Sequence, residues 1–287
     1  MPFRVACGQF APFKADVERN LDRIAEIILQ AQDEQVDLLT FPEACTTGYF
    51  LEGGVLEASL TIDGLIERLE DRLGDKVTRT IDVVLGFYQN LGGNLYNSAA
   101  YLEIHSDGII AHGVYQKFFL PTYGVFDEDR FVSRGRDLQI FPTRLGRMAL
   151  LVCEDVWHGI MPTLCAVNGA KVLIVPSASP ARGFATADIE NHDRYKRLFR
   201  AISEEHGIFC VNCQLTGFEG GKGFIGGSMV FDPMGHVIAE APAGEESLLI
   251  AEIDLDLISI ARSQSPLIQD LQSAWEEVRR LVSMSNF

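Results

Sequence analysis

The chain has 287 residues, of which 47% are hydrophobic and 22% are charged, and these proportions are ordinary for a globular protein with a sizeable core. Its formal net charge of −16 disfavours phosphate backbones and anionic headgroups, so we expect neither nucleic acid nor a membrane as a partner. The start, MPFRVACGQF, does not resemble a secretory signal, and no apolar run reaches the ~20 residues that cross a bilayer. We therefore expect a cytoplasmic protein whose six cysteines are free thiols.

Hydrophobic periodicity in the first half of the chain predicts strands that alternate with helices and then a hairpin around the turn signal Ser106-Asp107-Gly108. The elements expected there are a strand (3–9), an amphipathic helix (16–35), a short buried strand (36–41), a polar helix (64–76), a strand (81–89) and the two arms of the hairpin (96–104 and 109–116).

The second half continues the alternation and adds a second hairpin around Asp-Pro-Met-Gly. The elements expected there are a strand (147–152), a helix (159–168), a strand (171–176), a long helix (186–206), a strand (208–214), the hairpin (227–231 and 236–241), a strand (247–253) and a final helix (267–282). No linker and no repeat interrupts them. The pattern predicts one α/β domain with mixed sheets, in which helices cover apolar strands.

Cys153 is the first candidate for chemistry, because it follows the apolar run Ala-Leu-Leu-Val and precedes the polar pair Glu154-Asp155. A nucleophile functions well at the end of a strand, where a sharp turn exposes it and backbone N–H groups converge. A cysteine at this point is also common as a small core residue, so the position alone does not decide between the two.

Two further segments place ionisable side chains at strand ends. Glu43 follows a buried strand and Pro42, where a partly desolvated carboxylate is able to act as a general base. Lys117 ends the second arm of the first hairpin, and Glu128 follows it eleven residues later as a carboxylate that would keep the ammonium charged. Each of these residues alone has a structural explanation, as a loop carboxylate or a lysine that reaches for solvent.

Together the phrases FPEACTTGY, YQKFFLPTYGVFDE and LLVCEDVWH, in this order, resemble the three signature regions of the nitrilase superfamily, the carbon–nitrogen hydrolases. The resemblance extends over nearly the whole chain, from Phe3 to Ile253. It implies a four-layer α-β-β-α sandwich, which we assign to residues 1–260. Apolar residues at helical spacing from Leu267 to Leu281 predict residues 261–287 as a helical extension that packs on the domain or on a dimer partner. The resemblance also implies a homodimer or a higher homo-oligomer.

The resemblance further implies that Glu43, Lys117 and Cys153 are catalytic and that Glu128 positions the site. In such a site Cys153 attacks an amide carbonyl, Glu43 transfers protons, and a thioester is hydrolysed with release of ammonia, without a metal or an organic cofactor. The motifs are most similar to the glutaminase domain of glutamine-dependent NAD synthetases. That similarity implies substrate contacts from Tyr123 and Glu154, with Ser177 and Ser179 nearby, and it favours an amide that carries an ammonium group.

Several alternatives stay open at this level. The chain ends at Phe287 without an ATP-binding glycine loop, so we expect a free-standing amidase or a separate glutaminase subunit of an ammonia-using ligase. Hydrolysis of nitriles or of N-carbamoyl amino acids is a further possibility.

Cys210 and Cys213 form a C-x-x-C motif, which in other proteins is a redox or zinc site. Their flanks predict a strand, where residues three apart point to opposite faces, so we expect these two cysteines to be structural. The six histidines do not cluster at metal spacing.

Overall fold

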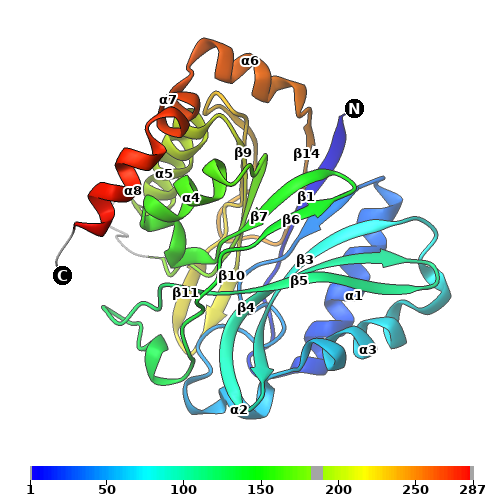
Figure 1. The fold of residues 1–287 in the computed structure, drawn as a ribbon. Coiled ribbons are helices and arrows are strands. Elements are labelled where there is room, and N and C mark those ends of the chain that lie inside the picture. Colours follow the sequence, from blue (N-terminus) through cyan, green and yellow to red (C-terminus); the bar gives the residue numbers. More distant parts are fainter. Residues whose placement is uncertain (1, 182–189, 285–287) are drawn as a thin grey trace.

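The computed structural model describes residues 2–181 and 190–284. Two six-stranded sheets lie face to face, and helices cover the outer face of each (Figure 1). Within the described residues, no helix is both long and apolar enough to cross a membrane. The helix predicted over residues 186–206 begins outside the described part, in which α5 runs from Glu190 to His206.

The first sheet has the strand order β14-β1-β2-β3-β4-β5, in which β1, β2 and β3 are parallel and the other pairs are antiparallel. The strands are β1 (Phe3–Gln9), β2 (Leu38–Thr40), β3 (Ile81–Leu91), β4 (Asn94–His105), β5 (Gly108–Gln116) and β14 (Ser247–Ile253). Helices α1 (Val17–Asp33) and α3 (Ile62–Leu73) pack their apolar faces on its outer side. The side chain of Asp16 accepts from the Arg19 N–H and so caps the start of α1.

The second sheet has the order β13-β12-β9-β8-β7-β6, with β7, β8 and β9 parallel. The strands are β6 (Ile140–Thr143), β7 (Gly146–Leu150), β8 (Val172–Ser177), β9 (Phe209–Gln214), β12 (Met229–Phe231) and β13 (Val237–Glu240). Helices α4 (Ile160–Val167) and α5 cover its outer side (Figure 1). The central strands carry no polar alternation because both of their faces are covered.

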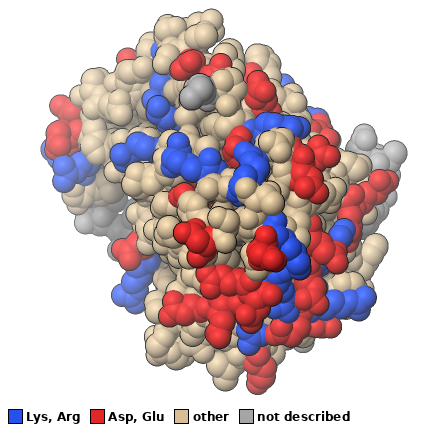
Figure 2. Space-filling view, turned by 90° about the vertical axis from the view of Figure 1, so that its right-hand side faces the viewer, with Lys and Arg blue, Asp and Glu red and all other residues tan. Residues whose placement is uncertain are grey.

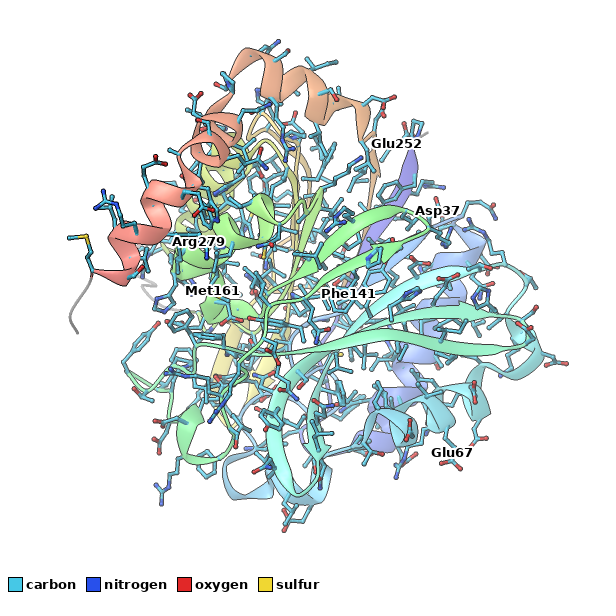
Figure 3. All side chains as sticks on the ribbon, in the orientation of Figure 1. Asp37, Glu67, Phe141, Met161, Glu252 and Arg279 are labelled. Atoms are coloured by element: carbon cyan, nitrogen blue, oxygen red, sulfur yellow. The ribbon has the colours of Figure 1, made fainter. Side chains whose placement is uncertain are left out.

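Side chains from both sheets meet in one buried cluster between them, which includes Val5 and Val84 from the first sheet and Met148 and Phe141 from the second. Phe141 lies between the sheets in Figure 3 and stacks on Tyr101 with ring centroids 5.8 Å apart. Burying a side chain of this size contributes about 1.5–3 kcal/mol. The layers are therefore α-β-β-α, and the predicted fold class is confirmed.

Most predicted elements are present with ends that differ by a few residues, and four parts of the structure differ more. The hairpin of β10 (Thr216–Glu219) and β11 (Lys222–Ile225) and the strand β6 were not predicted. The strand expected over 147–152 ends at Leu150, so a short loop precedes Cys153. The final helix is broken at Ala274 into α7 (Leu267–Ser273) and α8 (Trp275–Ser283). The remaining short elements, also not predicted, are η1 (Glu52–Gly54), α2 (Val55–Ala58), η2 (Gly74–Lys76), η3 (Glu128–Arg130), η4 (Cys153–Trp157) and α6 (Asp256–Gln264).

Acidic side chains gather in the lower part of the face that Figure 2 shows, and a band of basic side chains crosses its upper part. On α1 and α3, Arg72 pairs with Glu18 at 2.6 Å and with Asp22 at 2.7 Å. Exposed pairs of this kind contribute little to stability. The net charge of −16 of the whole chain disfavours a phosphate backbone, whereas this face carries charges of both signs.

Candidate active site

Cys153 lies in a strained turn just beyond β7. It is the first residue of η4, its backbone φ is +47°, and its side chain is 8% exposed. A residue with a Cβ rarely adopts this left-handed conformation, which costs about 1–3 kcal/mol when the surroundings impose it. Strain of this kind is frequent at functional sites. The turn brings the sulfur to the edge of the second sheet, at the C-terminal end of a parallel strand.

The buried carboxylate of Asp155 holds this turn in place. It accepts hydrogen bonds from the Val152 N–H at 3.0 Å and the Tyr115 hydroxyl at 2.8 Å. It also accepts from the N–H groups of Phe118 and Phe119, which directly follow Lys117. Burial raises the pKa of Asp155 to about 6, so the group is ionised at neutral pH. One side chain thereby joins the turn of Cys153 to the segment that carries Lys117.

Glu43 lies on a loop that packs tightly against β3. The loop leaves β2 at Thr40, and the residue after Glu43, Ala44, has a φ of +49°. Gly86 on β3 lies directly beneath, and a Cβ at that position would approach the Pro42 carbonyl oxygen to 2.4 Å. Only a glycine allows the loop to come this close. The side chain of Glu43 is fully buried as a result.

Lys117, Glu43 and Glu128 form one buried cluster. The Lys117 ammonium donates to Glu43 Oε1 and to Glu128 Oε2, both at 2.7 Å. The amide of Asn97 on β4 donates to the same two carboxylates, at 2.8 and 2.5 Å. The second oxygen of Glu43 accepts from the Ala178 N–H at 2.8 Å, just beyond β8. Donors from both sheets therefore fix the carboxylate of Glu43.

Burial and charge set the protonation of these groups. The pKa of Glu43 is raised, first by burial and also by the charge of Glu128, while Lys117 acts in the opposite direction. The pKa of Lys117 is raised well above its ordinary value, because the two carboxylates outweigh the effect of burial. The pKa of the Cys153 thiol is raised by burial and by Glu43. At neutral pH the lysine is charged and the thiol keeps its proton.

Cys153 opens into a cavity of about 170 Å³. Of the four residues predicted to contact substrate, Tyr123, Glu154 and Ser179 line this cavity. The Tyr123 hydroxyl donates to both oxygens of Glu154, at 3.0 and 2.9 Å. Ser177 does not belong to the described lining, because its side chain is fully buried and its hydroxyl accepts from Asn212.

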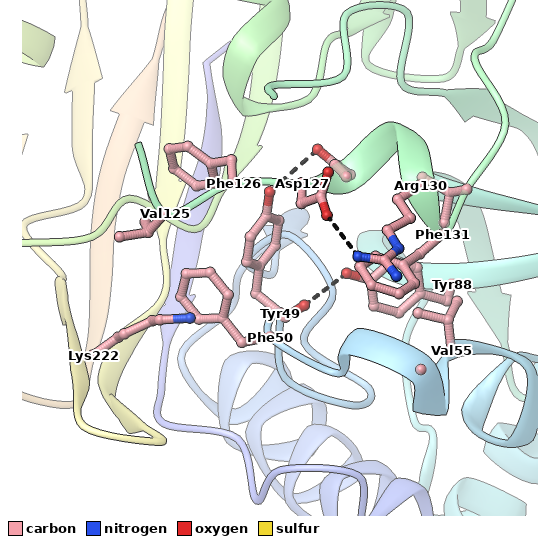
Figure 4. A pocket seen from close by; sticks show the side chains of 13 residues that line it. Tyr49, Phe50, Val55, Tyr88, Val125, Phe126, Asp127, Arg130, Phe131 and Lys222 are labelled. Carbon is pink, nitrogen blue, oxygen red and sulfur yellow. Dashed lines mark hydrogen bonds and ion pairs between the residues drawn. The ribbon is translucent and has the colours of Figure 1, made fainter. Parts of the chain in front are cut away.

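A second cavity of about 500 Å³ lies beside the cluster (Figure 4). It is lined by Glu128, by aromatic rings such as Tyr49 and Phe126, and by Arg130 and Lys222, but not by Cys153. The Tyr49 hydroxyl donates to Glu128 at 3.2 Å. Phe126 lines both cavities. The larger space therefore borders the carboxylate that positions Lys117, while the smaller space reaches the sulfur.

Sequence reasoning did not identify several residues of this site: Asn97, Asp155, Arg194 and Tyr195. Asp155 was visible as the second member of the polar pair after Cys153, which is a usable signal. Asn97 follows no motif, and its position depends on strand register. Arg194 and Tyr195 lie on α5, where the sequence shows only a polar helix.

His158, five residues after Cys153, is outside the described lining of the Cys153 cavity. Its ring stacks on the ring of Phe119, with centroids 3.6 Å apart.

Comparison with known families identifies the chain. The model of the carbon-nitrogen hydrolase family matches residues 4–263. The chain belongs to the carbon–nitrogen hydrolase family. The predicted family is confirmed, and solved structures of the nitrilase superfamily share the sandwich.

Curated relatives of this carbon–nitrogen hydrolase include two glutamine-dependent NAD(+) synthetases. The protein from Acinetobacter baylyi is 29% identical over 257 residues, and that from Xylella fastidiosa is 31% identical over 257 residues. These alignments cover 88% and 87% of this chain but only 44% of either relative. The chain thus spans less than half the length of the relatives it matches.

Solved structures point to the same fold. A glutamine-dependent NAD+ synthetase from Acinetobacter baumannii aligns with a TM-score of 0.78 at 27% identity, over 90% of this chain and 47% of that one. An amidase from Nesterenkonia sp. AN1 aligns with a TM-score of 0.75 at 26% identity, over 91% and 97% of the two chains. In that amidase structure, acrylamide has undergone Michael addition at the active-site cysteine.

Proposed function

We propose that this carbon–nitrogen hydrolase cleaves a small linear amide through a thioester on Cys153 and releases ammonia. The observation that carries the proposal is the convergence of four strand ends on one sulfur. Glu43 follows β2, Lys117 follows β5, Cys153 follows β7 and Ala178 follows β8. A nucleophile, a base and a fixed cation beside a small cavity are the groups that acyl transfer requires.

The chemical steps follow from these groups. Glu43 takes the proton of the Cys153 thiol as the sulfur attacks the amide carbon. Lys117 and the backbone N–H of Glu154 stabilise the oxyanion, and each donor commonly contributes ~3 kcal/mol. Glu43 then returns its proton to the leaving nitrogen as the carbon–nitrogen bond breaks. A water that gives its proton to Glu43 hydrolyses the thioester, and the thiol is restored when that proton returns to the sulfur.

The cavity supports a substrate that carries an ammonium group. Glu154 presents a carboxylate to the cavity, and Tyr123 holds that carboxylate. Arg194 also lines the cavity, so the wall carries charges of both signs and matches a zwitterion better than a simple cation. The names of the relatives point to glutamine as the amide. Arg194 is also able to pair with the carboxylate of an N-carbamoyl amino acid, so such substrates stay in the test.

A separate glutaminase that supplies ammonia to a ligase is the second candidate, and the NAD(+) synthetase relatives favour it. The two candidates share the same site and differ in the fate of the ammonia. A free-standing amidase releases ammonia to solution without a partner. A glutaminase subunit is expected to increase its rate when the ligase is present.

The test measures ammonia release from ω-amides, neutral aliphatic amides, N-carbamoyl amino acids and nitriles. The wild type is expected to act first on glutamine-like amides, and Cys153→Ala to lose all turnover with an unchanged circular dichroism spectrum. Glu154→Gln is expected to raise KM for glutamine-like amides and to spare neutral amides. Turnover by Cys153→Ala above about a hundredth of the wild type would refute the thioester route, since a missing nucleophile costs far more.

A further inference from the structure

The nucleophile has a neighbour on α5. The hydroxyl of Tyr195 lies 3.4 Å from the Cys153 sulfur, within hydrogen-bonding distance for sulfur. Tyr195 is 2% exposed, although it lines the wall of the Cys153 cavity. It reaches the sulfur from the second sheet's helix layer, whereas Glu43 and Lys117 come from the first sheet.

Packing fixes the ring that carries this hydroxyl. The ring of Tyr195 meets the ring of Trp157 edge to face, with centroids 4.9 Å apart, and lies 6.1 Å from the ring of Phe199. Because the ring is held on two sides, its hydroxyl stays at the sulfur without a large loss of side-chain freedom. Cys153 is a hydrogen-bond partner of this hydroxyl, and the side chains of Ser179 and Trp157 also lie close enough to lower its pKa.

The other groups around the sulfur stabilise a thiolate poorly, so a hydrogen-bond donor at this position favours its formation. Thiolate formation is opposed by burial and by the charge of Glu43. Two of the three N–H groups of the Lys117 ammonium already donate to carboxylates. Burial and the charge of Cys153 raise the pKa of Tyr195, and the hydrogen bond with Tyr195 lowers the pKa of the Cys153 thiol.

We propose that Tyr195 is a further catalytic residue, whose O–H donates to the Cys153 sulfur and stabilises the negative charge that develops there during attack. Once Glu43 has taken the thiol proton, the sulfur has no hydrogen left to donate, so the phenol is the donor of this pair. Tyr195 keeps its proton in every step: the proton moves from sulfur to Glu43 and then to the leaving nitrogen. This inference rests on the proposed role of Cys153 as nucleophile.

The test follows alkylation of Cys153 by iodoacetamide against pH, with the modified residue located by peptide mass spectrometry. This reaction reports the thiolate directly and needs no substrate. Tyr195→Phe keeps the packed ring and removes the donor. Since a hydrogen bond to a charged group changes an equilibrium by about tenfold or more, the variant is expected to react at least about tenfold more slowly at fixed pH, with its profile shifted to higher pH. Its kcat/KM should fall by a similar factor.

Tyr101→Phe is the matched control, because Tyr101 is equally buried but donates to Asp82 instead. It is expected to leave the alkylation profile of Cys153 unchanged. Replacement of Tyr195 by 3-fluorotyrosine retains the shape with a more acidic phenol, and it should shift the profile to lower pH.

An unchanged profile in Tyr195→Phe or in the fluorinated protein would overturn the role of Tyr195 while leaving Cys153 as the nucleophile. Absence of any preferential alkylation of Cys153 in the wild type would overturn both proposals. If Tyr195→Phe fails to fold, as judged by circular dichroism, the fluorinated protein alone decides.

Discussion

At the scale of single residues, Lys117 is shared between two carboxylates and leaves the buried cluster with an excess of negative charge. Breaking a buried ion pair by removing one partner typically costs 3–5 kcal/mol, because the other charge remains unpaired. Either carboxylate therefore affects folding as well as chemistry. A comparison of Glu43 with Glu128 separates the two effects, since both contact Lys117 and Glu43 is the one proposed to take the thiol proton.

The first prediction at this scale concerns proton transfer. Glu43→Gln keeps the shape of the side chain but cannot accept the thiol proton, so kcat should fall by about 10²–10⁴. Glu128→Gln, the matched control, should reduce kcat less, because the base remains. A fall of the same size in both variants would mean that Glu43 serves only to hold Lys117.

The pH profile gives a second measure of the same group. Because the pKa of Glu43 is raised by burial, its carboxyl stays protonated to a higher pH than an ordinary glutamate. The base exists only above that raised pKa, so kcat/KM of the wild type should fall with decreasing pH while still above the ordinary range near 4.5. An acid limb at or below that range would contradict the role of Glu43 as base.

At the scale of elements, the loop of Lys117 and the turn of Cys153 are held by a single carboxylate. Asp155 accepts from the Tyr115 hydroxyl, from the Val152 N–H and from the two N–H groups that follow Lys117. An amide in its place presents two donor hydrogens to surroundings that are themselves donors. The tie between the two segments depends on charge as well as on shape.

We therefore predict that Asp155→Asn is less stable and less active. An unsatisfied buried hydrogen-bonding group costs about 1–3 kcal/mol, so the melting temperature should fall by several degrees. Activity should fall in kcat more than in KM, because Cys153 and Lys117 lose their relative placement. Asp75→Asn, an exposed aspartate in η2, serves as the control and should change neither. Wild-type stability in Asp155→Asn would show that this carboxylate does not tie the segments.

Strands were the most predictable elements because their apolar runs are local signals. Residues 3–9 and 247–253 form the strands expected to the residue, yet nothing local indicates that Phe3 pairs with Ile253. The place of Asn97 beside Lys117 likewise depends on the register of β4 with β5.

The β10–β11 hairpin was missed although Gly220 and Gly221 form a turn between its arms. The three residues proposed as catalytic were found through motifs, whereas Tyr195 required the position of a helix on a sheet.

At the scale of the whole molecule, the described part of the C-terminal region leaves apolar side chains exposed. Helix α7 packs against α4 and α5, but α8 buries no residue. Val282, 63% exposed, and Ile160 on α4, half exposed, line one groove between α4 and α8, and Leu281 on α8 is 57% exposed. We propose that residues 261–287 act as an extension of a domain formed by residues 1–260, and that this surface contacts a second copy.

The expected solution mass is then at least twice 31.8 kDa at micromolar concentration, as measured by light scattering. Val282→Lys, which places a charge in the groove, should lower that mass. Glu277→Lys alters the charge of the same helix outside the described lining of the groove and should not. A monomeric wild type would refute the contact.

Gly86 is a position at which this protein does not tolerate a side chain. The atoms that a methyl group would meet there belong to the backbone of Pro42, Glu43 and Ala44, not to a side chain that a second mutation might shorten. No single compensating substitution relieves the clash, because every residue type carries the same backbone. A lineage that loses this glycine must rebuild the loop that carries Glu43, so the position is expected to change only together with that loop.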